Sequence, residues 1–144
     1  MPAPEPHEHF GVYGAWLQDG RLVTIEKVRG PYTGWLDLPG GAPEAGECRE
    51  QTLARELDEE CGAAVRSVLE WHPFEFRVEL ASDRRRPIDF RHRGLIALVD
   101  ALGPVRPVES VEDVARVVLL DLGSDRPVSP PVSLAQELLA RRLE

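Results

Sequence analysis

The sequence predicts an α/β protein of one domain, with helices on both faces of a mixed β-sheet. Its 144 residues fall within the usual size of a single domain. Strand-like segments stand before and after a segment with helical spacing, and a second helical segment closes the chain. This order of strands, helix, strands and helix is typical of a sheet packed between helical layers.

Composition and charge exclude several classes of protein. Hydrophobic residues make up 42% of the chain and charged residues 29%, as in soluble globular domains. A net charge of -8 argues against a nucleic acid polymer as partner, because such binders carry an excess of Lys and Arg. No apolar run reaches the roughly 20 residues of a membrane-spanning helix, and residues 1–9 lack the features of a secretory signal. We expect a cytoplasmic protein with no membrane partner, a flexible lead at 1–8 and one domain at 9–144.

The first third of the chain predicts a hairpin and then a loop. Residues 9–17 are rich in aromatic and small apolar side chains, and Asp19-Gly20 is a two-residue turn typical of antiparallel strands. Residues 21–28 form the returning strand, with Val23 and Ile25 on one face. Residues 29–41 hold four glycines and two prolines, so we expect a loop with at most a very short strand.

A helix is predicted for residues 47–61. Leu53 and Leu57 stand one turn apart, and Gly62 is placed to end the helix. Cys48 and Cys61 would lie about 20 Å apart along it, too far for a disulfide between them. We expect both to be reduced structural cysteines rather than ligands or nucleophiles.

The second half predicts further strands and a closing helix. Residues 65–80 and 88–101 are predicted strands joined by the polar loop 81–87, and the β-branched run 114–120 is predicted as a buried strand. Ser133 followed by Gln136 resembles a capping box, which predicts a closing helix of about three turns.

Acidic residues gather on the predicted helix at 47–61. Between positions 44 and 60, seven acidic residues stand against two basic ones. At 100° per residue, Glu56, Glu59 and Glu60 share one edge of the helix. Like charges at i and i+4 destabilise a helix unless a countercharge is present, and hard oxygen ligands suit Mg²⁺ or Mn²⁺. If charge alone is considered, the alternative to a metal site is an acidic helix face that is exposed to solvent and binds no ion.

The spacing of residues 41–63 favours the metal site. It resembles the Nudix box, GX5EX7REUXEEXGU, where U is a bulky aliphatic residue. A chance match is on the order of one in a billion per window. Leu38-Pro39-Gly40-Gly41 before the box, the hairpin and the closing helix also resemble the Nudix (MutT-like) family. The matching residues are Gly41, Glu47, Arg55, Glu56, Leu57, Glu59, Glu60 and Gly62, with the last aliphatic position weakened to Ala63.

The resemblance implies a Nudix α/β/α sandwich and a pyrophosphohydrolase. The implied reaction is metal-dependent attack of water at phosphorus, cleaving the diphosphate linkage of a nucleoside diphosphate linked to another moiety. Glu56, Glu59 and Glu60 would hold Mg²⁺ or Mn²⁺. The backbone carbonyl of Gly40 or Gly41 would add an oxygen ligand, since a glycine pair lets the backbone approach an ion closely.

The resemblance also assigns supporting roles. Arg55 would orient a neighbouring glutamate by ion pairing. Glu47, Gly41 and Gly62 would hold the loop and the helix in place. Each of the three glutamates is a candidate general base. Glu112, from the acidic group Glu109, Glu112 and Asp113, is a further candidate ligand, with a solvated loop acid as the alternative.

The sequence gives less specific signals for the residues that would contact the substrate. Tyr32 and Trp35 lie in the glycine-rich loop, where they would either stack on a base or pack the hairpin onto the sheet. Arg84, Arg85 and Arg86 would either grip phosphates or form a solvated hairpin tip. No signature after Gly62 identifies the substrate.

Two other functions stay open at this point. One is a Nudix-like module that senses a nucleotide without cleaving it, and the other is an acidic interaction helix without a ligand. We expect a small nucleotide derivative as the partner, and homodimerisation is left open.

Overall fold

The computed structural model describes residues 3–106 and 114–143, which form two helices and two β-sheets. The elements in chain order are β1 (Pro6–Ala15), β2 (Leu17–Gln18), β3 (Arg21–Lys27), β4 (Leu36–Asp37), β5 (Gly40–Gly41), α1 (Arg49–Cys61), β6 (Ala64–Leu80), β7 (Pro87–Leu102), β8 (Val114–Leu120) and α2 (Pro130–Arg142). The α/β class predicted from the sequence is confirmed.

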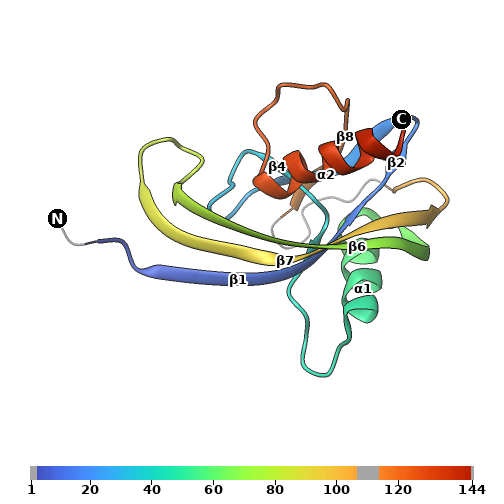
Figure 1. Cartoon of the computed structure of the whole chain (residues 1–144), viewed down its shortest axis with the longest axis horizontal. Helices are drawn as coiled ribbons and strands as arrows, with labels where there is room; N and C mark the ends of the chain where they lie inside the picture. Colours follow the sequence, from blue (N-terminus) through green and yellow to red (C-terminus); the bar gives the residue numbers. More distant parts are fainter. Residues whose placement is uncertain (1–2, 107–113, 144) are drawn as a thin grey trace.

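The strands form two sheets, and the first of them is the mixed sheet expected between the helices. The first sheet has the order β5-β1-β7-β6, in which β1 runs parallel to β7 and the other pairs are antiparallel. In the second sheet β3 pairs with β2, β4 and β8, all antiparallel. The division arises because β3 pairs with β4 and β8 and not with β1. Figure 1 shows β1, β7 and β6 as a long curved layer that carries the N-terminus at its far end.

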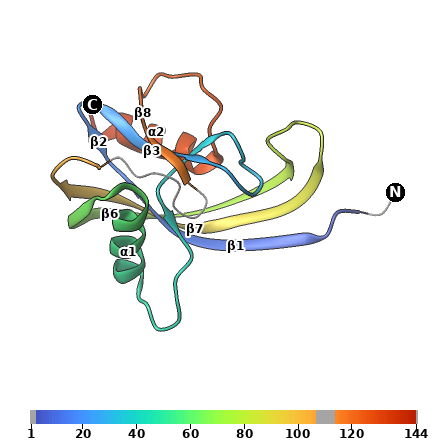
Figure 2. The same ribbon diagram turned by 180° about the vertical axis from the view of Figure 1, so that it is seen from behind.

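The first sheet lies between two hydrophobic cores. Successive residues of a strand point to opposite faces, so Tyr13 of β1 enters one core and Val12 enters the other. Val132 of α2 packs in the core of Tyr13, and Leu57 of α1 packs in the core of Val12. The two helices therefore lie on opposite sides of the sheet, as Figures 1 and 2 both show. This is the α/β/α sandwich expected from the resemblance.

The predicted hairpin turn is confirmed. Asp19 and Gly20 both have positive φ angles, 54° and 76°, and Gln18 faces Arg21 across the turn. This is the backbone of a two-residue turn that matches the twist of the strands it joins. The strands predicted at 21–28, 65–80 and 88–101 agree with β3, β6 and β7 to within one residue at each end.

Helix α1 begins at Arg49, two residues after the predicted start. The N–H of Cys48 donates to Oε1 of Gln51, which stabilises the first turn. Gly62 ends the helix in the left-handed conformation at φ 63°, and its N–H donates to the carbonyl of Asp58. The predicted helix stop is confirmed, and Leu57 is fully buried beneath it.

The predicted start of the closing helix is wrong. Helix α2 begins at Pro130 after the N-cap residue Ser129, so Ser133 lies inside the first turn. Proline is favoured at the first helical positions, where its missing N–H needs no partner. The Gln136 side chain donates to the carbonyl of Leu122 instead of capping the helix.

Two strands also differ from expectation. Strand β1 begins at Pro6 and pairs with β7 from there, so the strand includes residues assigned to the flexible lead. In β8, whose bounds agree with the prediction, only Val114 and Leu120 are fully buried. Within the part of the chain that the structure describes, no helix is long and apolar enough to cross a membrane.

Candidate active site

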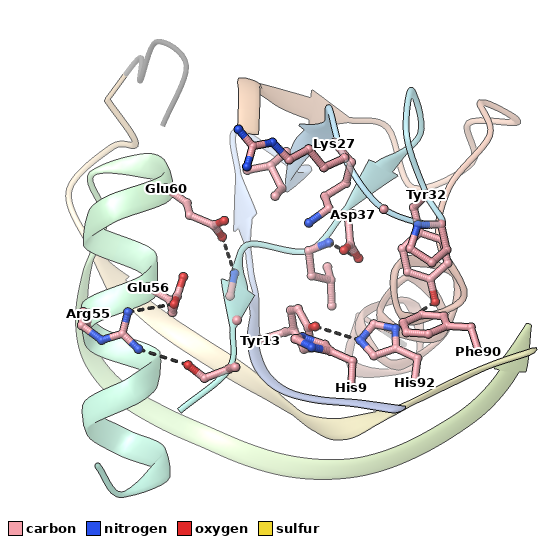
Figure 3. A pocket seen from close by; sticks show the side chains of 18 of the residues that line it. His9, Tyr13, Lys27, Tyr32, Asp37, Arg55, Glu56, Glu60, Phe90 and His92 are labelled. Carbon is pink, nitrogen blue, oxygen red and sulfur yellow. Dashed lines mark hydrogen bonds and ion pairs between the residues drawn. The ribbon is translucent and has the colours of Figure 1, made fainter. Parts of the chain in front are cut away.

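The three glutamates at the end of the predicted motif differ in exposure. Glu56 and Glu60 are buried, with 6% and 3% of their surface exposed. Both project from α1 toward the loop that carries Gly40 (Figure 3). The Glu59 side chain is 36% exposed. Helical spacing explains this difference, because Glu56 and Glu60 are one turn apart on the buried side while Glu59 stands at its edge.

Arg55 connects the start of the motif to its end. Its Nε and Nη2 donate to the two carboxylate oxygens of Glu47, at 2.7 Å and 2.9 Å. Its Nη1 donates to Oε1 of Glu56 at 2.8 Å and, more weakly, to Oε2 of Glu59 at 3.4 Å. The bonds from Arg55 are the main reason that the pKa of Glu47 is lowered to about 2. One guanidinium thus holds the loop before α1 and the carboxylate of Glu56.

Gly40 and Gly41 bring the backbone against these carboxylates. The Gly40 N–H donates to Oε1 of Glu60 at 2.6 Å. A Cβ at Gly41 would lie 2.8 Å from the carboxyl carbon of Glu56, and a Cβ at Gly40 would lie 2.2 Å from the carbonyl oxygen of Val12. A side chain at Gly40 would clash with backbone, whereas a side chain at Gly41 would displace the Glu56 carboxylate. The register Tyr13↔Gly40 with β1 holds the pair in place.

Glu60 is held in an environment that disfavours its charge. Burial is the main cause that raises the pKa of Glu60 to about 8, the nearby charge of Glu56 adds to the effect, and the Gly40 N–H opposes it. Two buried carboxyl groups so close together call for a cation to stabilise both charges. Oxygen donors of this kind suit Mg²⁺ or Mn²⁺.

The expected convergence of three carboxylates is not present in this arrangement. Among the described residues, no group of three or more His, Cys, Asp or Glu side chains stands close enough to hold an ion. Glu56 and Glu59 both turn to the Arg55 guanidinium, which supplies a countercharge.

A pocket of about 540 Å³ extends from the glutamates of α1. This size is in the range of sites that hold small ligands. Its acidic end is formed by Gly40, Gly41, Arg55, Glu56 and Glu60. Its far end, at the other side of the opening in Figure 3, is lined by His9, Tyr13, Tyr32, Phe90 and His92. Further lining residues include Lys27, Arg29, Asp37 and Glu44.

Asp37 and Lys27 come to the pocket from the second sheet, and the sequence did not single them out. Asp37 is buried and accepts hydrogen bonds from the Ser129 hydroxyl at 2.6 Å and from the Leu38 N–H at 2.9 Å. Burial raises the pKa of Asp37, and the nearby charge of Lys27 is among the influences that lower it. These contacts connect the glycine loop with the N-terminus of α2.

His92 is the central residue of the far end and was also missed. Tyr13 and Tyr32 place their hydroxyls 2.8 Å from its Nε2 and Nδ1, respectively. Burial is the main cause that lowers the pKa of His92 to about 3. Strand alternation was an available signal, because Arg91 and Arg93 on either side are exposed and must leave His92 facing inward.

The two aromatic residues predicted for substrate binding occupy different places. Tyr32 is buried and lines the pocket. Trp35 does not line it but stacks on Tyr32, with ring centroids 6.5 Å apart and an interplanar angle of 8°. Trp35 instead lines a separate apolar depression with residues of β6 and α2, such as Phe76 and Leu134. Of the two roles considered for Trp35, stacking on a base or packing within the fold, its position therefore agrees with packing.

The predicted arginines are not brought to the pocket. Arg84, Arg85 and Arg86 are exposed at the tip between β6 and β7, where the Asp83 carboxylate accepts the N–H groups of Arg85 and Arg86. None of the three lines the pocket. Glu112, with the neighbouring acids at 109 and 113, lies outside the described residues.

The fold defines a class of known proteins. A MutT NUDIX hydrolase from Burkholderia pseudomallei is similar, at 22% identity and a TM-score of 0.69, over 91% of this chain and 97% of that one. A MutT protein from Methanosarcina mazei Go1 is similar over 99% of both chains, at 15% identity and a TM-score of 0.70. The NUDIX domain of Shewanella oneidensis NrtR, solved with ADP ribose, is similar at 16% identity and a TM-score of 0.70, over 97% of this chain and 91% of that one. These likenesses show a NUDIX-type fold.

The sequence itself establishes membership. The family model for the NUDIX domain matches residues 5–131, and the chain belongs to the NUDIX family. An ADP-ribose pyrophosphatase of Methanocaldococcus jannaschii is 36% identical over 56 residues. That match spans 39% of this chain and only 33% of the relative.

Proposed function

We propose that this protein is a metal-dependent hydrolase that cleaves the diphosphate linkage of a nucleoside diphosphate linked to another moiety. The observation that carries the proposal is the contact of the Gly40-Gly41 backbone with Glu56 and Glu60, at one end of a pocket of nucleotide size. Membership in the NUDIX family supports it. Residues of α1 and the glycine loop would meet the diphosphate, and the far end would take the nucleoside or the second moiety.

Mg²⁺ or Mn²⁺ would be held by Glu56, Glu59 and Glu60, with a backbone oxygen of Gly40 or Gly41. The bound ion would neutralise phosphate charge and lower the pKa of the attacking water. Binding requires Glu59 to leave the Arg55 guanidinium, to which it is held at only 3.4 Å. The cation would also favour the ionised form of Glu60, which burial alone disfavours.

The supporting roles follow from the contacts of Arg55. The Glu47 carboxylate fixes the guanidinium through two hydrogen bonds, and the guanidinium in turn orients the Glu56 carboxylate. Glu47 and Arg55 are therefore proposed as positioning residues. The proton of the attacking water would pass to one of the three motif glutamates.

The chemistry of the pocket supports a nucleotide. Tyr32 offers an aromatic wall for a base. Lys27 and Arg29 bring positive charge to a pocket whose acidic end would otherwise repel an anion. ADP-ribose is a candidate substrate because one relative is named an ADP-ribose pyrophosphatase and a protein of similar fold was solved with ADP ribose. A cytoplasmic location stays a prediction, and homodimerisation stays open.

A substrate screen tests the proposal. Nucleoside triphosphates, nucleotide sugars, dinucleoside polyphosphates and ADP-ribose are incubated with Mg²⁺ or Mn²⁺ in oxygen-18 water, and the labelled product identifies the phosphorus that is attacked. Turnover should require the added metal and collapse in Glu60→Gln. Asp58→Asn is the matched control, since Asp58 lies on the same helix with a side chain 70% exposed.

Two outcomes would count against hydrolysis at this site. An unchanged rate in Glu60→Gln would remove the acidic helix from the mechanism. Tight nucleotide binding without turnover, across the screen and with both metals, would favour the alternative of a nucleotide-sensing module.

A further inference from the structure

His92 lies at the centre of a group of rings at the far end of the pocket. It is 1% exposed, and the rings of His9, Tyr13, Tyr32 and Phe90 have centroids within 5.4–5.6 Å of its own. A buried imidazole in such surroundings is neutral. It then has one ring N–H, which donates a hydrogen bond, and one unprotonated ring nitrogen, which accepts one. Each of the two forms a hydrogen bond with one tyrosine hydroxyl. One hydroxyl must donate to His92 and the other must accept from it.

The two tyrosines stand on backbone of different rigidity. Tyr13 lies within β1, which pairs with β7 on one side and with β5 on the other. Tyr32 lies in the segment 28–35 between β3 and β4, which has no strand of its own. The same hydrogen bond to His92 therefore adds little constraint to Tyr13 and much to Tyr32.

Segment 28–35 is held from two sides. On its outer side, Ser82 between β6 and β7 donates its N–H to the carbonyl of Pro31 at 2.9 Å and its hydroxyl to the carbonyl of Thr33 at 2.7 Å. On its inner side, the Tyr32 hydroxyl meets Nδ1 of His92 on β7. Tyr32 is the ring that this segment contributes to the pocket. It packs against Trp35 and Phe90, and the inner hydrogen bond is the polar contact that fixes its hydroxyl end.

We propose that His92 is a positioning residue that holds the Tyr32 ring and thereby sets the width of the far end of the pocket for the planar base of a nucleotide. His92 itself would not contact the reacting phosphorus, because it lies at the opposite end of the pocket from Glu56 and Glu60 (Figure 3). The identity of the ligand rests on the proposed function.

Two ligands allow binding at the two ends of the pocket to be measured separately. ADP carries a base and a diphosphate, whereas inorganic pyrophosphate carries only the part that would meet the acidic end. Binding of each, with Mg²⁺, is measured by calorimetry for the full chain and its variants. Tyr32→Phe removes one hydroxyl and keeps the ring, and His92→Phe removes both hydrogen bonds. Phe74→Leu is the control, because Phe74 packs edge-on against His92 at 5.2 Å but does not line the pocket.

The proposal predicts a selective effect. Tyr32→Phe and His92→Phe should weaken ADP binding about tenfold and change pyrophosphate binding less than about twofold, as expected for one lost hydrogen bond at the far end. Phe74→Leu should lower the melting temperature and leave both affinities within about twofold. With a substrate in hand, Tyr32→Phe should raise KM and leave kcat nearly unchanged.

Other outcomes would overturn the proposal. One such outcome is an equal loss of ADP and pyrophosphate binding in Tyr32→Phe. Another is a loss of ADP binding in Phe74→Leu as large as that in Tyr32→Phe. Either would show that His92 contributes only to packing. If His92→Phe does not fold, Tyr32→Phe decides alone. Failure of the wild type to bind ADP would refute the base site but leave hydrolysis of another diphosphate open. Selective ADP binding without any turnover would refute the proposed hydrolysis and leave the role of His92 standing.

Discussion

Replacing Gly41 by alanine should damage the proposed active site while leaving the fold intact. The new Cβ would stand 2.8 Å from the carboxyl carbon and from Oε1 of Glu56, whereas ordinary contact begins at 3.4 Å. The Glu56 carboxylate must therefore move by roughly half an ångström. It is the end of a flexible side chain, and Gly41 does not have a positive φ angle, so the backbone need not change.

The displacement should cost activity more than stability. A misplacement of about 1 Å in a reacting constellation costs about a hundredfold in rate, so half of that shift predicts a kcat about tenfold lower. The free energy of unfolding should change by less than about 1 kcal/mol, because the alanine also reduces the entropy of the unfolded chain. Steady-state kinetics on the substrate found by the screen, with Mg²⁺, and urea unfolding measure the two quantities.

The neighbouring glycine provides the contrast. At Gly40 the φ angle is +149°, and a Cβ would meet the backbone oxygen of Val12 at 2.2 Å. Gly40→Ala should therefore lose about 2 kcal/mol or more of stability. Gly123→Ala, with no atom within 4 Å of the new Cβ, is the neutral control. Full activity of Gly41→Ala, or a loss of stability equal to that of Gly40→Ala, would refute the assigned contact with Glu56.

Three further predictions concern the helix and the far end. Arg55→Lys should lower kcat by at least about tenfold, because an ammonium group cannot keep both the two hydrogen bonds to Glu47 and the bond to Glu56. A full rate in this variant would contradict the positioning role of Arg55. Leu57→Ala should cost about 2–5 kcal/mol in urea unfolding, since Leu57 is fully buried, and a loss below 1 kcal/mol would show a looser core. The pKa of His92 is about 3 in the folded protein against 6.5 for the free side chain, so the unfolded chain binds more protons between these values. Stability should fall as pH drops from about 6.5 toward 3, by at most about 1.4 kcal/mol per pH unit from this group, and His92→Phe should flatten that slope in urea titrations.

The acidic end of the site was predictable from the sequence because its geometry is local. Helical periodicity alone puts Glu56 and Glu60 one turn apart, and Gly62 ends the same helix. The glycine loop is only a few residues upstream. A contiguous motif thus specifies which side chains face the loop, although it did not indicate that Glu59 would turn to Arg55.

The far end was predictable only in part, since Tyr32 was singled out but its partners depend on pairing between distant strands. His92 reaches Tyr13 only through the parallel pairing of β7 with β1, and Tyr32 comes from a segment without regular structure. Neither register nor loop conformation is encoded in a short pattern. The predicted start of α2 was wrong for a different reason, since Ser133 offered a plausible cap while the observed cap, Ser129, lies four residues earlier and is followed by Pro130.

The parallel pairing of β1 with β7 also bears on how the chain acquires its pocket. His9 and His92 are aligned across that pair but lie 83 positions apart in the chain, with both the glycine loop and α1 between them. Closing so long a loop is entropically costly and slows folding. During synthesis on the ribosome, α1 and the β2–β3 hairpin emerge well before β7. The pocket is therefore completed late, and until then one long edge of β1 stays without its partner strand.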